Sequence, residues 1–191
     1  SHKGHEVTVV DNYFRRQSCL ELNIHPLYEN LNLIDRAKLW HDLTGKEIKV
    51  VIDDLRKSEV MNNLFNSKIN YSWTINKNKK DIPETVIHYA EQPSAPYSLM
   101  SQEKSQFTLL NNLSVTHNLL WSIKEFATET HLIKLGTMGE YGTPNIDIEE
   151  GWININHKGR SDKFLYPRQA GSIYHTSKIM DTDLLWYAVR M

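Results

Sequence analysis

A tyrosine and a lysine four residues apart, Tyr174 and Lys178 in the run YHTSK, are the side chains of this sequence best suited to acid–base chemistry. At this spacing both lie on one face of a helix, one turn apart. A nearby ammonium group stabilises a phenolate, so we expect Lys178 to lower the pKa of Tyr174 from about 10 and make it a base near neutral pH. A surface Tyr and Lys on an ordinary helix give the same pattern, so the pair needs support from elsewhere.

Thr137 gives that support, because it follows the apolar run HLIKLG (131–136), which predicts a strand. A hydroxyl at this strand end can hydrogen-bond a hydroxyl or carbonyl of a substrate. A Tyr-Lys helix that follows a strand-end Gly-Thr pair is a much narrower pattern than the Tyr-Lys pair alone.

Carboxylates follow two other predicted strands. Asp11 ends the run Val7–Val10 and can accept hydrogen bonds from a ribose diol, and Asp54 follows a second apolar strand, where it could meet an adenine amino group. Arg15 and Arg16 could face the phosphates or the adenosine edge of a dinucleotide. Taken singly, each residue also fits an ordinary turn or loop.

A third predicted strand, Glu84–Ala90, is followed by a segment with two prolines and several polar groups. Glu91, Gln92, Ser94 and Tyr97 could form part of a binding site there. The same segment also fits a plain strand-to-helix turn.

A scaffold that brings strand ends together is required if these residues are to act as one site. The hydrophobic pattern predicts four strands, at 7–10, 47–55, 84–90 and 131–136, and helices at 33–43, 57–66, 101–127 and 172–190. Short apolar strands alternating with helices predict an α/β fold, a doubly wound parallel sheet of the Rossmann type. Ligands of such sheets bind at the carboxyl ends of the strands. The lysine-rich stretch 76–82 is expected to be a solvated connector.

Composition narrows the classes of partner. The net charge is −1 with 24% charged residues, which gives no large field to attract nucleic acid or an anionic membrane. The single cysteine, Cys19, excludes a disulfide framework and a cysteine-rich zinc site. The nine histidines are scattered, so no metal site is expected. No apolar run approaches the roughly 20 residues of a membrane span.

Together these residues resemble the extended short-chain dehydrogenase/reductase family, whose members act on nucleotide sugars with a bound NAD. The resemblance runs along nearly the whole chain, in VDNYFRR, LTGKEI, VIHYAEQPSAPYS, NNLSVTHNLLWSIKEF, HLIKLGTMGEYGTPNIDIEEG and YPRQAGSIYHTSK. The run KLGTMGEYGTPNIDIEEG is the most specific. It resembles the branch of the family that makes a sulfonated sugar nucleotide from UDP-glucose and sulfite for sulfolipid head groups, and it implies a loop that covers the sugar.

The resemblance implies a role for each matching position. The catalytic residues would be Thr137, Tyr174 and Lys178, with Glu140 and His175 moving protons in later steps. The NAD-binding residues would be Asp11, Asn12, Arg15, Arg16, Asp54, Leu55, Ala90, Glu91, Asn111, Asn112, Tyr174 and Lys178. The substrate contacts would be Gln92, Ser94, Thr137, Met138, Gln169 and Tyr174.

Departures from the family leave other readings open. Ala90 stands where the family often has Gly, Pro93 stands where it often has Arg, and residues 17–36 match poorly. The alternatives are an NAD-dependent epimerase or 4,6-dehydratase of nucleotide sugars and, in another class, a non-catalytic binding protein on the same fold. The resemblance also implies a cytoplasmic protein, or a stromal one in a plant or alga, and a possible homodimer.

The ends of the chain predict a fragment. No glycine-rich dinucleotide loop precedes the first strand, and nothing follows the Tyr-Lys helix, so we expect residues 1–191 to form a partial NAD-binding domain. Without that loop the pyrophosphate of NAD would lack a helix N-terminus, and we expect the isolated chain to show no turnover.

Overall fold

The computed structural model describes residues 3–76, 82–149 and 151–190, and the chain divides into two compact units. Unit 1 comprises Ser1–Ala90 and Asn118–Ile133, and unit 2 comprises Glu91–His117 and Lys134–Met191. Most of the predicted connector at 76–82 lies outside the described residues.

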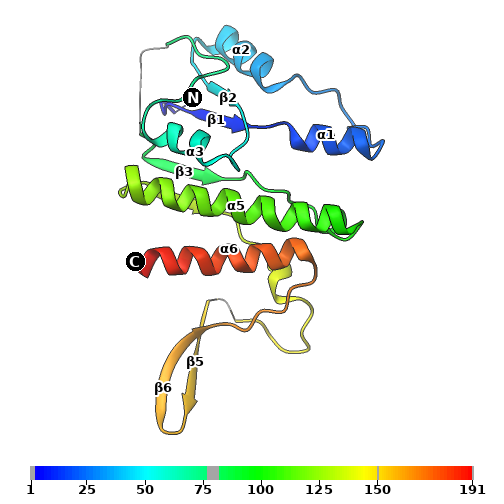
Figure 1. Cartoon of the computed structure of the whole chain (residues 1–191), viewed down its shortest axis with the longest axis vertical. Coiled ribbons are helices and arrows are strands. Elements are labelled where there is room, and N and C mark those ends of the chain that lie inside the picture. Colours follow the sequence, from blue (N-terminus) through cyan, green and yellow to red (C-terminus); the bar gives the residue numbers. More distant parts are fainter. Residues whose placement is uncertain (1–2, 77–81, 150, 191) are drawn as a thin grey trace. The chain divides into compact units, whose positions relative to one another are not determined.

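Unit 1 contains a parallel strand pair. Strands β1 (Thr8–Asp11) and β2 (Lys49–Ile52) pair with Thr8 opposite Lys49 and Asp11 opposite Ile52, in the parallel sense that the sequence predicts (Figure 1). The helices of this unit are α1 (Phe14–Glu21), α2 (Leu33–Thr44) and α3 (Ser58–Phe65), joined by the end of α5 (Gln102–Phe126) from Asn118 onward. Strand β3 (Thr85–His88) pairs with β4 (His131–Lys134).

The interior of unit 1 is apolar. Val50 and Val51 of β2 are 0% and 2% exposed, and Met61 and Phe65 of α3 are both 2% exposed. The buried residues of α3 are Val60, Met61 and Phe65, and Met61 and Phe65 lie one turn apart on one face, as the amphipathic pattern predicts. This core fixes the carboxyl ends of β1 and β2; Asp11 is the last residue of β1, and Asp54 follows β2 by two residues.

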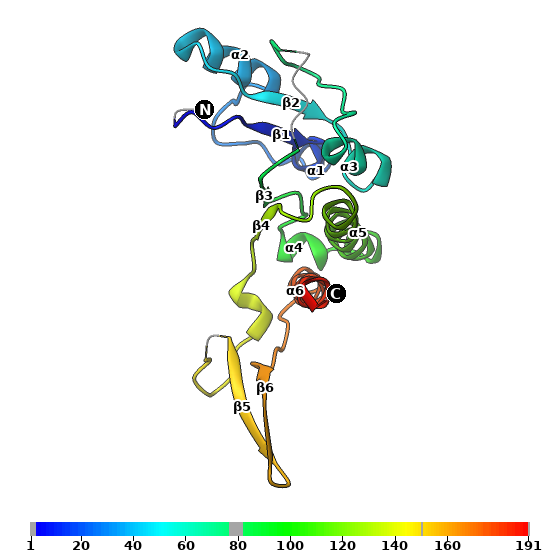
Figure 2. The ribbon, with the colours of Figure 1, turned by 90° about the vertical axis from the view of Figure 1, so that its left-hand side faces the viewer.

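Unit 2 is built from helices and one hairpin. It contains α4 (Ala95–Ser98), residues 102–117 of α5, the 3₁₀ turn η1 (Met138–Tyr141) and α6 (Ile173–Arg190). Helices α4 and η1 both contact α6, and α6 runs beside this part of α5 in both views (Figures 1 and 2). The buried residues of this unit are mainly polar, namely Gln92, Ser98, Thr108, Asn111, Asn112, Thr116, Ser172, Ser177, Lys178 and Asp181, beside Tyr97 and Val115.

A β-hairpin in unit 2 has no counterpart in the sequence prediction. Strands β5 (Trp152–His157) and β6 (Arg160–Leu165) pair antiparallel around Lys158 and Gly159, whose φ angles are +49° and +75° (Figure 2). Two positive φ values in a two-residue turn match the twist of a hairpin, and glycine adopts one of them at no cost. No helix in the described ranges is both long and apolar enough to cross a membrane.

Candidate functional site

The charged centre of unit 2 is a chain of four buried side chains at the ends of β3 and β4 and on α6. Lys178 donates a hydrogen bond to Oε2 of Glu91, and the Nζ of Lys134 lies 3.1 Å from Oε1 of the same carboxylate. Lys134 also lies 3.1 Å from Oδ2 of Asp181. The four side chains are only 0–6% exposed, so they are ionised partners largely removed from water.

The pKa of Tyr174 differs from the sequence prediction. Burial is the largest cause that raises the pKa of Tyr174, and the negative charge of Glu91 raises this pKa further. The positive charge of Lys134 lowers it. Lys178 is held by Glu91, so its charge is already compensated. The expected lowering of the Tyr174 pKa by Lys178 is therefore wrong for the chain in this state.

Burial is also the largest influence on the pKa values of Lys178, Asp181 and Lys134. It lowers the pKa of Lys178, with Lys134 adding to the effect and Glu91 opposing it. It raises the pKa of Asp181 from 3.8 to about 6, against the opposing charge of Lys134. Although burial lowers the pKa of Lys134, Glu91 and Asp181 together raise it above its usual value.

The strand-end turn η1 packs directly on the first turn of α6. A methyl group at Gly139 would overlap the imidazole ring of His175, so only glycine allows this close approach. The backbone N–H of Gly171 donates to the carbonyl of Gly139 at 3.2 Å, and that of Gln169 to the carbonyl of Glu140 at 2.9 Å. Thr137 and Tyr174 thus belong to two segments in direct contact, as the predicted site requires.

The predicted side chains around this contact differ in their surroundings. Thr137 begins η1, and its Oγ1 accepts a long bond of 3.4 Å from the N–H of Gly139. Oε2 of Glu140 is buried and has no hydrogen-bond partner among the described residues, an arrangement that calls for a proton donor. The Nδ1 of His175 lies 3.1 Å from the Oγ of Ser172, and Met138 is 89% exposed.

The side chains near β3 that were predicted to contact the substrate or the nicotinamide instead form hydrogen bonds within the protein, mostly to its backbone. Gln92 is 4% exposed, and its Oε1 accepts the N–H of Ser94, whose own hydroxyl caps α4. Asn112 is fully buried and bonds the N–H and carbonyl of Gln92 and the hydroxyl of Ser177. These side chains therefore position Glu91, and Asn111 donates to Asn112.

In unit 1, the predicted adenosine residues lie at the start of α1. Asp11 and Asn12 are exposed, and each accepts one local backbone N–H, from Tyr13 and Phe14 respectively. Among the described residues, the second oxygen of the Asp11 carboxylate has no hydrogen bond, and it can accept one from a ribose diol. Arg15 is exposed.

Arg16 binds backbone carbonyls of the loop before α2, which the sequence did not predict. Its Nη2 donates to the carbonyls of Asn30 and Leu31, both at 2.8 Å, and its guanidinium lies over the ring of Tyr13. It is thus tied to the loop before α2, and facing a dinucleotide would require it to leave these carbonyls.

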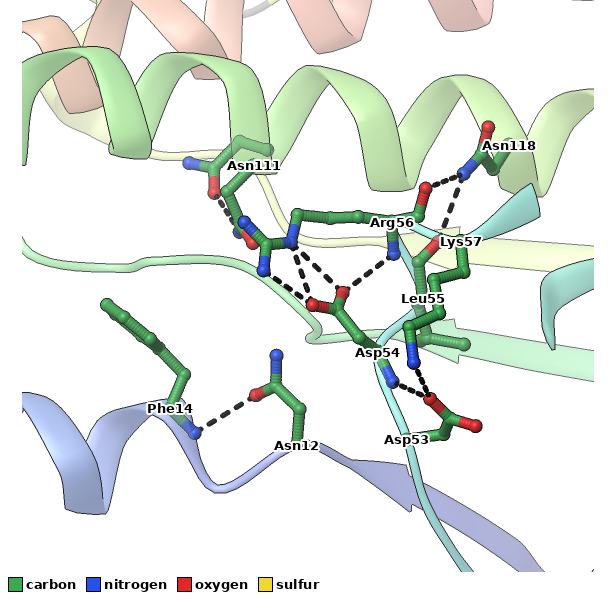
Figure 3. Close-up of polar contacts among 10 residues, drawn as sticks. Asn12, Phe14, Asp53, Asp54, Leu55, Arg56, Lys57, Asn111 and Asn118 are labelled. Carbon is green, nitrogen blue, oxygen red and sulfur yellow. Dashed lines mark hydrogen bonds and ion pairs between the residues drawn. The ribbon is translucent and has the colours of Figure 1, made fainter. Parts of the chain in front are cut away.

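The residues after β2 that were predicted to contact the adenosine, Asp54 and Leu55, are also held by contacts within the protein (Figure 3). Asp54 forms a two-pronged ion pair with Arg56, which lowers the pKa of the carboxyl group. The side chain of Asn118 donates to the carbonyls of Leu55 and Arg56 at 3.1 and 3.0 Å. Leu55 is therefore fixed through its backbone, by an α5 residue that sequence reasoning did not select.

Two residues of the charged cluster, Lys134 and Asp181, were also missed. A signal existed for each. Lys134 is the one charged side chain within the apolar run LIKLG, and Asp181 follows Lys178 by three positions, on the same face of α6.

Comparison with known sequences finds two informative relatives, whereas no protein-family model matches the chain. It is 43% identical over 182 residues to UDP-sulfoquinovose synthase, chloroplastic, of Spinacia oleracea, and 33% identical over 187 residues to UDP-sulfoquinovose synthase of Sulfolobus acidocaldarius. These matches cover 95% and 96% of the chain but only 35% and 44% of the relatives. The sequence resemblance to this group of enzymes is thereby confirmed.

Solved structures share the fold. UDP-glucose 4-epimerase of Bifidobacterium longum, solved with NAD⁺ and UDP, matches 97% of the chain and 42% of its own, with a TM-score of 0.61 at 23% identity. UDP-glucuronic acid 4-epimerase of Bacillus cereus, solved with NAD, matches 98% and 45%, with a TM-score of 0.59 at 16% identity. The predicted α/β fold of the Rossmann type is confirmed.

Proposed function

We propose that this chain carries the catalytic segment of a UDP-sulfoquinovose synthase, which converts UDP-glucose and sulfite into UDP-sulfoquinovose with a bound NAD. The proposal draws its reaction from the names of the spinach and Sulfolobus relatives, which match nearly the whole chain. The product is the sulfonated head-group donor for sulfolipid. The supporting observation in the structure is the contact of η1 with α6, which unites the Thr137 and Tyr174 segments.

The chain offers groups that fit the two halves of NAD. In unit 1, the Asp11 carboxylate, one oxygen of which accepts the N–H of Tyr13, suits the adenosine ribose diol, with Asn12 and Arg15 beside it. Asp54 would meet the adenine amino group only by giving up part of its ion pair with Arg56. In unit 2, Lys178 and Tyr174 suit the nicotinamide ribose. NAD, when bound, supplies the acceptor that takes a hydride from the sugar and later gives it back.

Tyr174 is the base in the first step. As phenolate it takes the proton of the 4-hydroxyl while hydride leaves C4, and the Thr137 hydroxyl donates a hydrogen bond to the reacting oxygen. Because burial and Glu91 raise the Tyr174 pKa, a cation near the phenol is needed to favour the phenolate near neutral pH. Release of Lys178 from Glu91 provides that cation.

The later steps need further proton carriers. The 4-ketone acidifies the C5 proton, so a base can remove it while the C6 hydroxyl leaves as water. In this proposal Glu140, whose buried Oε2 has no hydrogen-bond partner among the described residues, takes the C5 proton, and His175 protonates the leaving hydroxyl. Sulfite then adds at C6 through sulfur, C5 is reprotonated, and hydride returned to C4 restores the hydroxyl with the proton held by Tyr174.

The proposal is tested by incubating the full-length protein with UDP-glucose, NAD and sulfite and identifying the product by mass spectrometry. A sulfonated nucleotide sugar is expected from the wild type and none from Tyr174→Phe, which keeps the ring but lacks the base. UDP-galactose, or a 4-keto-6-deoxy sugar formed without sulfite incorporation, would instead indicate an epimerase or a 4,6-dehydratase.

A further inference from the structure

Lys134 has no role in the reaction described above, yet it is the central member of the buried charged cluster. Its ammonium group lies 3.1 Å from Glu91 and 3.1 Å from Asp181, and Glu91 binds Lys178 through its other oxygen. The order of contacts is therefore Lys178, Glu91, Lys134, Asp181. Two positive and two negative charges balance.

The proposed reaction asks Lys178 to leave Glu91. A buried carboxylate that loses its paired cation is strongly destabilised, because the uncompensated charge remains out of water. Glu91 is 6% exposed, so water cannot replace the lost lysine fully. A second cation on Glu91 removes most of this penalty, and Lys134 already occupies that place.

We propose that Lys134 is a positioning residue that keeps Glu91 paired, so that Lys178 can move from Glu91 to the nicotinamide ribose and Tyr174. Asp181 in turn holds Lys134 in place, because Asp181 is completely buried and faces Lys134 directly. The inference rests on the proposed function, since that function requires Lys178 to leave Glu91.

The charges that act on the phenol of Tyr174 also support a role for Lys134. The charged groups that act on its phenol are Glu91, Lys134 and Asp181, and the ring of His175 lies 5.2 Å away. Glu91 and Asp181 raise the pKa of Tyr174, whereas Lys134 lowers it more than Asp181 raises it. Lys134 is therefore the cation that limits the rise while Lys178 is held by Glu91.

The test compares Asp181→Asn with the double variant Lys134→Met/Asp181→Asn in the full-length protein. The double variant balances charge and volume, and replacing a buried pair by neutral residues of similar shape is often tolerated, so it should fold. In it, Glu91 loses its contact with Lys134 and keeps its ion pair with Lys178. NAD affinity, measured by calorimetry, is expected to be at least about tenfold weaker in the double variant than in Asp181→Asn.

The second readout needs no cofactor. NMR titration of the Tyr174 ring carbon, assigned with Tyr174→Phe, is expected to show a higher pKa in the double variant than in Asp181→Asn. Lys163→Met, which removes an exposed lysine of β6, serves as the control for loss of a positive charge and should match the wild type.

Equal NAD affinities and equal Tyr174 titrations in the two variants would overturn the role of Lys134. A wild-type protein that binds NAD but makes no sulfonated sugar would overturn the proposed reaction and leave the Lys134 comparison measurable. A wild type that fails to bind NAD would overturn both.

Discussion

Glu91 governs the state of the candidate site at the scale of single residues. It lies three residues after the end of β3, and the hydrogen bonds of Asn112 fix the backbone of the next residue, Gln92. From there its carboxylate holds Lys178 and raises the pKa of Tyr174. In this arrangement the pKa of the Tyr174 phenol is raised and Lys178 is paired with Glu91.

Asp181 gives this cluster a measurable effect on stability. Because its pKa is raised from 3.8 to about 6 on folding, the folded chain binds a proton that the unfolded chain releases in that interval. Its contribution to the free energy of unfolding is full below about pH 4 and is lost as the pH rises through 6, a change of about 3 kcal/mol. Asp181→Asn lacks this dependence.

We therefore expect the stability of Asp181→Asn relative to the wild type to increase between about pH 4 and about pH 7, as measured by urea unfolding. Asp162→Asn, on exposed β6, is the matched control and should show a smaller change. A relative stability of Asp181→Asn that stays constant over this range would contradict the burial of an acid with a raised pKa.

At the scale of elements, the close approach of η1 to α6 is the feature on which the site depends. Gly139 faces His175 with no room for a Cβ, whereas Gly136, three residues earlier, has nothing within 4 Å of that position. The two glycines therefore form a matched pair.

Gly139→Ala is expected to push η1 off α6, to cost about 1–3 kcal/mol in unfolding free energy, and to reduce kcat much more than Gly136→Ala does. Urea unfolding and steady-state kinetics of the full-length protein measure both effects. Equal behaviour of the two variants would mean that η1 does not need to contact α6.

Hydrophobic periodicity predicted the elements that bury a regular apolar face. The four strands, the helices α2, α3, α5 and α6, and the Tyr-Lys pair on α6 are confirmed with boundaries shifted by a few residues. Helix α1, helix α4, η1 and the hairpin were not predicted. The hairpin has a readable signal in WININH, where isoleucines alternate with polar residues before Lys158–Gly159, but this signal is shorter than that of a helix.

The chemistry of the site was predictable only in part. Residue types and spacing identify Thr137, Tyr174 and Lys178, since their pattern is local to a strand end and one helix turn. The Lys134–Glu91–Lys178 arrangement depends on tertiary contacts between segments far apart in sequence, which periodicity does not encode. For that reason the sequence alone assigned Lys178 to Tyr174 and missed its pairing with Glu91.

At the scale of the whole molecule, the two units differ in what they bury. Unit 1 has an apolar interior around Val50, Val51 and Phe65, whereas unit 2 buries asparagine, threonine, serine and ionised side chains. Burial of polar groups costs free energy unless each is hydrogen-bonded or paired, so the interior of unit 2 depends on its hydrogen bonds and ion pairs. All the proposed catalytic residues, Thr137, Glu140, Tyr174, His175 and Lys178, lie in unit 2.

The central claim is that one site oxidises C4, joins sulfite to C6 and reduces C4 again. The direct measurement uses the full-length protein with UDP-glucose that carries deuterium at C4, together with NAD and sulfite, and analyses the product by NMR and mass spectrometry. We predict a nucleotide sugar with sulfonate on C6, the glucose configuration at C4, and the deuterium retained there. A product without sulfonate and with inverted C4, or a sulfonated product that has lost the deuterium, would contradict the account.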